Sequence, residues 1–298
     1  MKNLLKYLIL KEKTLMVMAQ NEIHRDNRNM FLFLLLNKYS FIRFMLLKIF
    51  INNFKLKISN TLYVLLSIIL KKGDSFIDVG ANVGCVSDKA SWLVGKTGNV
   101  YSFEPSPTTM ILLQKRIKAL NLKNVHLNQF ALGSKQSDGL LHEFRENFGG
   151  SSSLAYGVDT APRQTLIGKT VIKIDTLDNF VHVNNIKKIK MIKIDVQGFE
   201  IDVLDGAREL LSSASPPILF VEVEKGALEA FNYSCDDLLN KILSFNYKIF
   251  SLRNNVLFTI ENYKDIPIEG HDDVICFNLN IKNHLLFFNT LLKLSTKV

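Results

Sequence analysis

Two short stretches carry side chains and glycines that could hold a nucleotide-like cofactor. The first, FIDVGANVG, runs from Phe76 to Gly84, and the second, YSFEP, places Glu104 further along the chain. Glycines let backbone N–H groups approach a ligand closely. An acid at the end of the next strand can accept hydrogen bonds from both hydroxyls of a ribose. Together the stretches predict a strand, a glycine turn, a helix and a second strand that form a cofactor site.

The glycine turn differs from the dinucleotide pattern G-x-G-x-x-G at its central position, which is Asn82 here. The central glycine of that pattern lets the backbone touch a pyrophosphate. An Asn side chain would crowd a pyrophosphate but can hydrogen-bond an amino-acid group, and Asp78 would repel phosphate. The turn therefore favours S-adenosylmethionine, which carries a sulfonium and no phosphate. The alternative is a turn without a ligand, in which these polar residues are ordinary caps.

A second set of acids follows two later apolar runs. The stretch IKIDVQGFE contains Asp195, and LFVEVE contains Glu222 and Glu224. The carboxyl ends of the strands of a doubly wound sheet meet in one crevice. We therefore expect Asp195 and one of the glutamates near the glycine turn, with Gly198 leaving room for an acceptor molecule.

These stretches together make the chain similar to the FkbM family of S-adenosylmethionine-dependent methyltransferases. The elements D-V-G-A-N-x-G, F-E-P-x-P, K-I-D-V-x-G-x-E and L-x-G-A, and an apolar run ending in E-V, occur in the family's order over roughly residues 62–253. The resemblance implies O-methyl transfer, often to a hydroxyl of a sugar or a natural product. It also implies a class I methyltransferase fold, which is a doubly wound, Rossmann-like α/β sheet with helices on both faces.

The resemblance implies roles for individual residues as well. Gln197 stands where the family more often has Glu, and because an amide cannot accept a proton, we expect no base at that position. The other roles are as follows: Asp78, Gly80, Asn82 and Gly84 would hold the methionine part of the cofactor, Glu104 the ribose, Phe130 with Ala131 the adenine, and Asp195 would face the methyl group and the acceptor.

Methyl transfer to a hydroxyl also needs a group that takes the hydroxyl proton. Asp195 is the first candidate for this base, and Glu222, His271, Glu200 and Glu224 follow. Glu200 is better explained as an exposed acid in the first turn of a helix. Asp195 and Glu222 occupy strand ends that carry metal-binding acids in catechol-type O-methyltransferases, so Mg²⁺ assistance is an alternative to the metal-free site that we expect.

From residue 59 onward, short apolar runs alternate with helical patterns, which predicts one domain, 59–298, built on a parallel sheet with crossover helices. The main strands are expected at 75–79, 99–104, 125–130, 190–194 and 217–223, further strands at 140–144, 169–174, 247–252, 256–260 and 274–279, and helices at 61–71, 84–93, 108–121, 236–245 and 284–294.

Residues 1–58 differ from the rest of the chain in charge. Residues 1–60 carry 11 Lys and Arg against three acids, a net charge of +8, whereas the remainder carries +1. The segment is also rich in Leu, Ile, Phe and Met, which predicts a basic, apolar helical extension. Such a helix can lie on the anionic inner face of a membrane, and a helix packed on the catalytic domain is an equal alternative.

The composition and charge of the chain limit the classes of protein to which it can belong. The near-neutral catalytic part gives no support to nucleic-acid binding, and three widely spaced cysteines predict a reduced, cytoplasmic protein without a disulfide framework. The main prediction is a methyltransferase acting on a hydroxyl of a sugar, glycan, glycolipid or natural product. The alternative is a non-catalytic scaffold in a membrane-associated glycan pathway, and an NAD-binding dehydrogenase comes third.

Overall fold

The computed structural model describes residues 61–145, 152–154, 165–253, 256–266 and 271–295, all within one unit, Lys57–Val298. The N-terminal extension predicted for residues 1–58 lies outside these ranges, so its helical character and its membrane contact stay predictions. None of the helices in the described ranges offers the continuous apolar length that a bilayer crossing requires.

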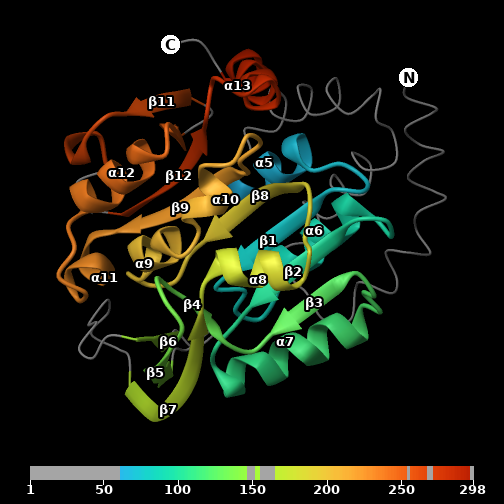
Figure 1. The fold of residues 1–298 in the computed structure, drawn as a ribbon, viewed down its shortest axis with the longest axis vertical. Helices are drawn as coiled ribbons and strands as arrows, with labels where there is room; N and C mark the ends of the chain where they lie inside the picture. The colour runs from blue at the N-terminus through green and yellow to red at the C-terminus, as the bar shows by residue number, and fades with distance from the viewer. Residues whose placement is uncertain (1–60, 146–151, 155–164, 254–255, 267–270, 296–298) are drawn as a thin grey trace. The chain divides into compact units, whose positions relative to one another are not determined.

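Parallel strands form the centre of an eight-stranded sheet (Figure 1). They lie in the order β3-β2-β1-β8-β9. The first strand, β1, thus lies in the middle of the sheet. Strands β2 and β3 extend the sheet on one side of β1, and β8 and β9 extend it on the other side. This reversal between β1 and β8 is where doubly wound folds bind their ligands. The bounds are β1 Ser75–Val79, β2 Asn99–Phe103, β3 Val125–Asn128, β8 Ile189–Ile194 and β9 Ile218–Glu224.

Antiparallel pairing continues the sheet beyond β9 through β12 (His271–Phe277), β10 (Lys248–Arg253) and β11 (Val256–Ile260). In the register of β12 against β9, Asp273 pairs with Glu222. The strand that the sequence predicts at 274–279 therefore starts three residues earlier. Its first residues, which include Asp273, then reach the carboxyl end of β9.

Helices cover both faces of the sheet, as the sequence predicts. The hydroxyl of Ser106 accepts the Thr109 N–H at the start of α7, and Ser234 with Asp237 forms a capping box on α12. The bounds are α5 Thr61–Ile69, α6 Cys85–Val94, α7 Pro107–Ala119, α8 Leu177–Val183, α9 Glu200–Asp205, α10 Arg208–Leu211, α11 Lys225–Glu229, α12 Cys235–Ser244, α13 Lys282–Leu294, and a 3₁₀ turn at Tyr263–Asp265.

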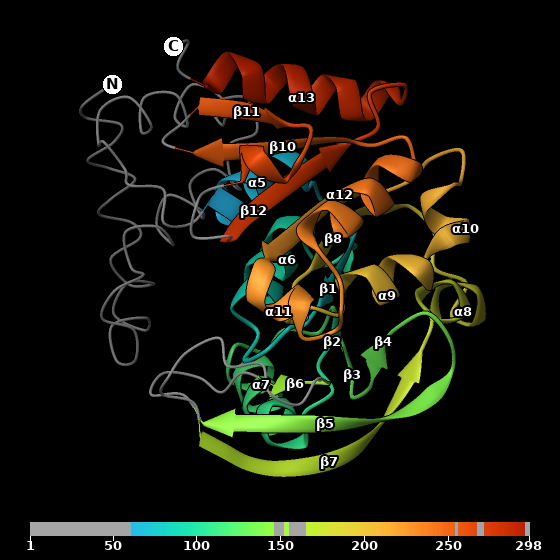
Figure 2. The ribbon, with the colours of Figure 1, turned by 90° about the vertical axis from the view of Figure 1, so that its left-hand side faces the viewer.

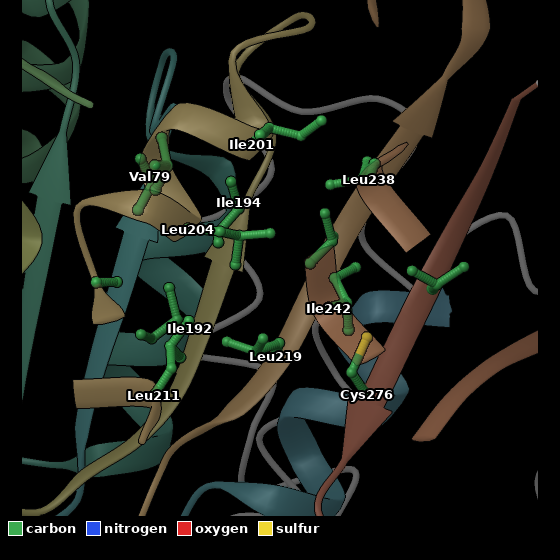
Figure 3. Packing of buried hydrophobic residues seen from close by; sticks show 14 of the residues in the cluster. Val79, Ile192, Ile194, Ile201, Leu204, Leu211, Leu219, Leu238, Ile242 and Cys276 are labelled. Atoms are coloured by element: carbon green, nitrogen blue, oxygen red, sulfur yellow. The ribbon is translucent and has the colours of Figure 1, made fainter. Parts of the chain in front are cut away.

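A large apolar core fills the space between the sheet and the helices α8, α9 and α12 (Figures 1 and 3). Strand side chains alternate between the two faces, so β1 sends Ile77 and Val79 into this core and Asp78 to the opposite face, where α6 lies. The same alternation turns Lys193 of β8 and Glu222 of β9 to the face of Asp78. Core residues labelled in Figure 3 include Val79, Ile192, Ile194, Ile201, Leu204, Leu219, Leu238 and Ile242.

A second, smaller sheet lies beside the first, where Figure 2 shows its long strands below the main sheet. Its order is β4 (Ala131–Leu132), β7 (Thr165–Asp175), β5 (Ser137–Arg145) and β6 (Ser152–Ser153). Side chains at the start of α7 connect this sheet to the main one. Ser106 Oγ and Thr108 Oγ1 both donate to the carboxylate of Glu143 on β5, the latter at 2.7 Å.

The loops that follow β1 and β8 touch through Gly80. This residue has φ +76°, and a Cβ on it would lie 1.9 Å from the backbone oxygen of Asp195. We expect Gly80→Ala to lower the free energy of unfolding by at least about 2 kcal/mol, through strain and forced separation of the loops.

Urea unfolding of Gly80→Ala and of Gly226→Ala tests this expectation. Gly226 lies in α11 with open space around the Cβ position, so its variant should be unchanged or more stable by up to about 1 kcal/mol. Equal stability of the two variants would contradict the close contact of the two loops.

Candidate active site

A cavity of about 470 Å³ opens at the reversal between β1 and β8. This volume is typical of small-molecule sites. Residues predicted from the sequence line much of it: Gly80, Asn82, Glu104, Phe130, Ala131, Asp195 and Glu222.

The glycine turn is fixed to the end of β2 by backbone hydrogen bonds. Gly80 and Ala81 donate their N–H groups to the carbonyl of Phe103 at 3.1 and 2.9 Å. Asn82 adopts φ 49° and donates its N–H to Glu104 Oε2 at 2.9 Å. The Asn82 side chain is exposed at the cavity and accepts the N–H of Val83. The turn therefore presents an amide side chain where a dinucleotide-binding turn has glycine.

Glu104 is buried at the end of β2, with 6% of its surface exposed. Its carboxylate accepts N–H groups from Ser106 at 3.0 Å and from Asn82 at 2.9 Å. Burial nevertheless raises the pKa of Glu104 to about 7, because the two N–H groups and Lys193 only partly compensate for lost hydration. The group changes charge near neutral pH, at the position predicted to bind a ribose.

A buried lysine, Lys193, joins the two loops beneath the cavity. Its Nζ donates to the carbonyl oxygen of Gly80 at 2.8 Å and lies 3.1 Å from Asp195 and 3.5 Å from Asp78. Burial alone would lower the pKa of Lys193, but Asp195 and Asp78 raise it above its ordinary value. Lys193 is therefore a permanent cation, held between one carboxylate in the cavity wall and one behind it.

Asp195 and Glu222 form a coupled pair of carboxyl groups joined by a hydrogen bond. Burial and the negative charge of Asp195 raise the pKa of Glu222 well above its ordinary value. Burial would also raise the pKa of Asp195, but Lys193 and the hydrogen bonds from Glu222 and Gln197 lower it instead. The two pKa values are therefore shifted in opposite directions, so Asp195 is the member of the pair that loses its proton at the lower pH.

Gln197 bridges this pair, with its Nε2 2.9 Å from Glu222 and 3.4 Å from Asp195. It adopts φ 57°. An amide donor there helps to keep the charge on Asp195 and cannot itself act as a base. About a third of the Asp195 side chain, 36%, is exposed, so a molecule in the cavity can reach it.

Two expectations about the loop after β8 are wrong. Glu200 does lie in the first turn of a helix, but it is buried, and its Oε1 accepts the N–H groups of Val196 and Gly198, both at 3.1 Å. Gly198 leaves no space for an acceptor, because a Cβ on it would lie 2.1 Å from the carbonyl oxygen of Ala227. Both residues shape the loop that carries Asp195 and Gln197.

Of the other residues predicted to bind the cofactor, Phe130 lines the cavity, whereas Asp78 and Gly84 are not among its described lining residues. Phe130 lines the cavity and packs edge-on against Phe103, with ring centroids 5.4 Å apart, which gives the cavity an apolar wall. Asp78 is fully buried and accepts the Ser87 hydroxyl at 2.5 Å, so it supports the glycine turn from behind. Gly84 faces α7, where a Cβ would lie 2.4 Å from the side chain of Leu113.

The His271 backbone starts β12, whereas its side chain lies outside the described part of the structure. Within the described ranges, no three His, Cys, Asp or Glu side chains are grouped as ligands for a metal ion.

Sequence reasoning missed two residues of this site, Lys193 and Asp273. Lys193 could have been found because it is a lone lysine inside the apolar run Met191–Ile194. If that strand is central, the lysine must be buried, and a buried lysine needs a partner. Asp273 lines the cavity opposite Glu222, and only the register of β12 brings it there.

The cavity fits S-adenosylmethionine better than a dinucleotide. Among the described lining residues, Lys193 is the one cation, and it already contacts Gly80, Asp78 and Asp195. A diphosphate would therefore meet carboxylates, whereas a sulfonium and an ammonium are favoured by them. Glu104 is available to ribose hydroxyls and Phe130 to an adenine ring. These individual contacts stay predictions.

A doubly wound sheet with acids around a cavity at its reversal point is the arrangement of Rossmann-like proteins that bind nucleotide-type cofactors. Residues 78–249 match the family described as the methyltransferase FkbM domain. This chain belongs to the FkbM methyltransferase family. The predicted doubly wound, Rossmann-like α/β sheet and the cofactor S-adenosylmethionine are thereby confirmed.

Two relatives and one solved structure are similar to this chain at sequence identities below 30%. "Methyltransferase 1" of Beauveria bassiana is 29% identical over 45% of this chain and 58% of its own length. "Hexuronic acid methyltransferase AglP" of Haloferax volcanii is 26% identical over 52% of this chain and 58% of its own length. The crystal structure of methyltransferase FkbM from Methylobacillus flagellatus KT has a TM-score of 0.44 and 17% identity, covering 69% of this chain and 44% of that one. The chain thus spans less than two thirds of each of these proteins.

Replacing Lys193 should destabilise the fold strongly. Lys193→Met keeps most of the side-chain volume but leaves Asp78 buried without its cation, so we expect a loss of about 3–5 kcal/mol in the free energy of unfolding. Lys190→Met is the matched control, because Lys190 lies on the same strand, is half-buried and contacts the ring of Phe287. Its loss should be about 1 kcal/mol or less. Urea unfolding measures both, and equal losses would show that Lys193 is not the central ion.

Cofactor affinity should depend on pH through Glu104. Ribose hydroxyls donate to a carboxylate, and the pKa of Glu104 is raised to about 7 without ligand. Binding therefore has to remove a proton below pH 7, and affinity should rise up to about tenfold per pH unit as pH increases toward 7, then level off near pH 8. Isothermal titration with S-adenosylhomocysteine across this range measures the slope.

Two variants identify the group responsible for this slope. Glu104→Gln should bind more weakly, because the new amide faces two N–H donors, and should show no slope. Glu200→Gln should keep the slope, although burial also raises the pKa of Glu200 to about 7. A slope that survives in Glu104→Gln would remove Glu104 from the ribose site.

Proposed function

We propose that this methyltransferase transfers the methyl group to a hydroxyl of a sugar, glycan or glycolipid. The observation that carries the proposal is the charged state of Asp195. It is a partly exposed carboxyl group in the cavity wall, and both Lys193 at 3.1 Å and a hydrogen bond with Glu222 lower its pKa and so favour its ionised form. Such a group can take the proton that an acceptor hydroxyl must lose.

When bound, S-adenosylmethionine supplies a methyl group on a sulfonium sulfur, and the electron pair of the broken S–C bond stays with sulfur. Asp195 receives the hydroxyl proton as the new O–C bond forms, so it acts as general base. Glu222 and Gln197 hold the Asp195 carboxylate in place through their hydrogen bonds. The wall of the cavity aligns the hydroxyl with the methyl group, which is the main contribution that an enzyme can make to such a displacement.

Support for a sugar acceptor comes from family membership and from the name of one relative. The Haloferax volcanii protein that is 26% identical to this chain is a hexuronic acid methyltransferase. The structure supports the proposal through the polar end of the cavity, where Asp195, Gln197 and Glu222 lie close together and can hydrogen-bond several hydroxyls.

Asp195 should be needed for turnover more than for cofactor binding. Asp195→Asn keeps the volume and the contact with Lys193 but cannot take a proton. We expect folded protein that still binds S-adenosylhomocysteine and methylates at least about a hundredfold more slowly. Transfer of radiolabelled methyl to glycan and glycolipid fractions, with calorimetric binding in parallel, measures both quantities.

Other results of this experiment would point elsewhere. Turnover within a few-fold of wild type would assign the base to Glu222 or His271, and loss of cofactor binding would make Asp195 a ligand contact. A wild-type protein that binds no S-adenosylhomocysteine at millimolar concentration would instead support a non-catalytic scaffold.

A further inference from the structure

A chain of buried polar side chains runs from α6 and β2 to Asp195, behind the cavity. Ser87 of α6 donates its hydroxyl to Asp78 Oδ2 at 2.5 Å, and its oxygen lies 2.7 Å from the hydroxyl oxygen of Ser102. A serine hydroxyl has one hydrogen to donate, so Ser102 is the donor to Ser87. Asp78, Ser87 and Ser102 are fully buried, and none of the three is among the described residues that line the cavity. They can act on the site only through a neighbour.

That neighbour is Lys193, which Asp78 shares with Asp195. The Lys193 ammonium lies 3.5 Å from Asp78 Oδ1 and 3.1 Å from Asp195 Oδ2. While Asp78 is a carboxylate, two negative charges compete for one ammonium group and also repel each other. The attraction of Lys193 for Asp195 is therefore weaker than it would be beside a neutral Asp78.

The charge on Asp78 depends on Ser87. Burial raises the pKa of Asp78, whereas Lys193 and the Ser87 hydroxyl lower it. Because the hydroxyl donates to a carboxylate oxygen, it favours the ionised form. Without this hydrogen bond Asp78 would keep its proton up to a higher pH, and over that interval Lys193 would have Asp195 as its single carboxylate partner in this chain of contacts.

Acids on neighbouring elements also act on this network. They are Glu104 after β2, Glu222 of β9, Glu200 of α9 and Asp273 of β12. Burial raises the pKa of Glu104 and that of Glu200 to about 7, so both change charge near neutral pH. Removing the Ser87 hydroxyl replaces none of these acids. A comparison of such a variant with the wild type at the same pH therefore isolates the effect that passes through Asp78.

We propose that Ser87 is a positioning residue for methyl transfer, which keeps Asp78 a carboxylate and thereby keeps Asp195 basic enough to take the acceptor proton. This inference rests on the proposed function, in which Asp195 is the general base. An undivided ion pair with Lys193 would make Asp195 a weaker base, and a weaker base takes a proton more slowly. Ser102 supports this role because its hydrogen bond turns the Ser87 hydroxyl toward Asp78.

Titration of the aspartate carboxyl groups tests the link between Ser87 and Asp78. In the full-length chain labelled with carbon-13 at the aspartate carboxyl carbons, the Asp78 NMR signal is identified by its absence in Asp78→Asn. We expect this signal to titrate at a pH higher by at least about 0.5 unit in Ser87→Ala. Ser91→Ala is the matched control, because Ser91 lies one turn further along α6, is also buried and donates its hydroxyl to Asn124. It should leave the Asp78 signal in place.

The rate of methyl transfer tests the link between Asp78 and Asp195. We compare kcat at saturating S-adenosylmethionine, on the glycan or glycolipid fraction that the wild type methylates. At a pH between the two Asp78 titrations, Asp78 is ionised in the wild type and protonated in Ser87→Ala, so kcat should be at least about threefold lower in the variant. The two rates should converge above and below this interval, with equal affinity for S-adenosylhomocysteine. Ser102→Ala should show the same pattern with a smaller shift.

The outcomes separate this inference from the proposed function. An Asp78 signal that does not move in Ser87→Ala, or a loss of rate that is equal at every pH, overturns the inference and leaves Asp195 as the base. A Ser91→Ala variant that behaves like Ser87→Ala overturns it as well. Turnover of Asp195→Asn within a few-fold of wild type overturns the proposed function instead, and that result comes from a variant in which Ser87 is intact.

Discussion

A single buried ammonium group, that of Lys193, holds the site together. It lies on the central strand β8, directly beside Asp78 in the pairing with β1, and it also reaches the carbonyl of Gly80 and the carboxylate of Asp195. Burying a cation is unfavourable unless acids compensate it. Here the compensating acids come from two strands, so the ion pairs fix both loops that border the cavity and also decide which carboxyl group is ionised.

The loops after β1 and β8 are both held by a buried glutamate that accepts backbone N–H groups. In the loop after β1, backbone N–H groups are accepted by Glu104 and Phe103. In the loop after β8, the acceptor is Glu200, which binds two N–H groups in a segment where Gln197 and Gly198 have positive φ. In each case a buried glutamate replaces the hydrogen bonds that a regular helix or strand would provide. Glu104 and Glu200 thus hold the backbone of the loops that border the cavity.

The sequence predicted the sheet well, because apolar runs such as 75–79 and 189–194 are bounded by polar residues and glycines that end strands. It expected the helix that begins at Glu200, α9, but missed α8, α10 and α11, which have fewer than two turns and so show no helical period. It found Glu104, Asp195 and Glu222, since these acids lie at or just beyond the carboxyl ends of strands. It could not predict the roles of Lys193 and Asp273, because each role depends on a partner in a neighbouring strand. The register between strands cannot be predicted from the residues of one strand alone.

The link between the two sheets has a consequence for the order in which the enzyme meets its substrates. Ser106 donates its N–H to Glu104, the acid predicted to bind the ribose, and its hydroxyl to Glu143 of the smaller sheet. Ser106 thus links Glu104 to strand β5, and Leu141 of that strand borders the cavity. If Glu104 binds the cofactor, this link would couple cofactor binding to the wall that β5 contributes, and such a coupling would favour compulsory-order kinetics, in which the methyl donor enters first and S-adenosylhomocysteine leaves last.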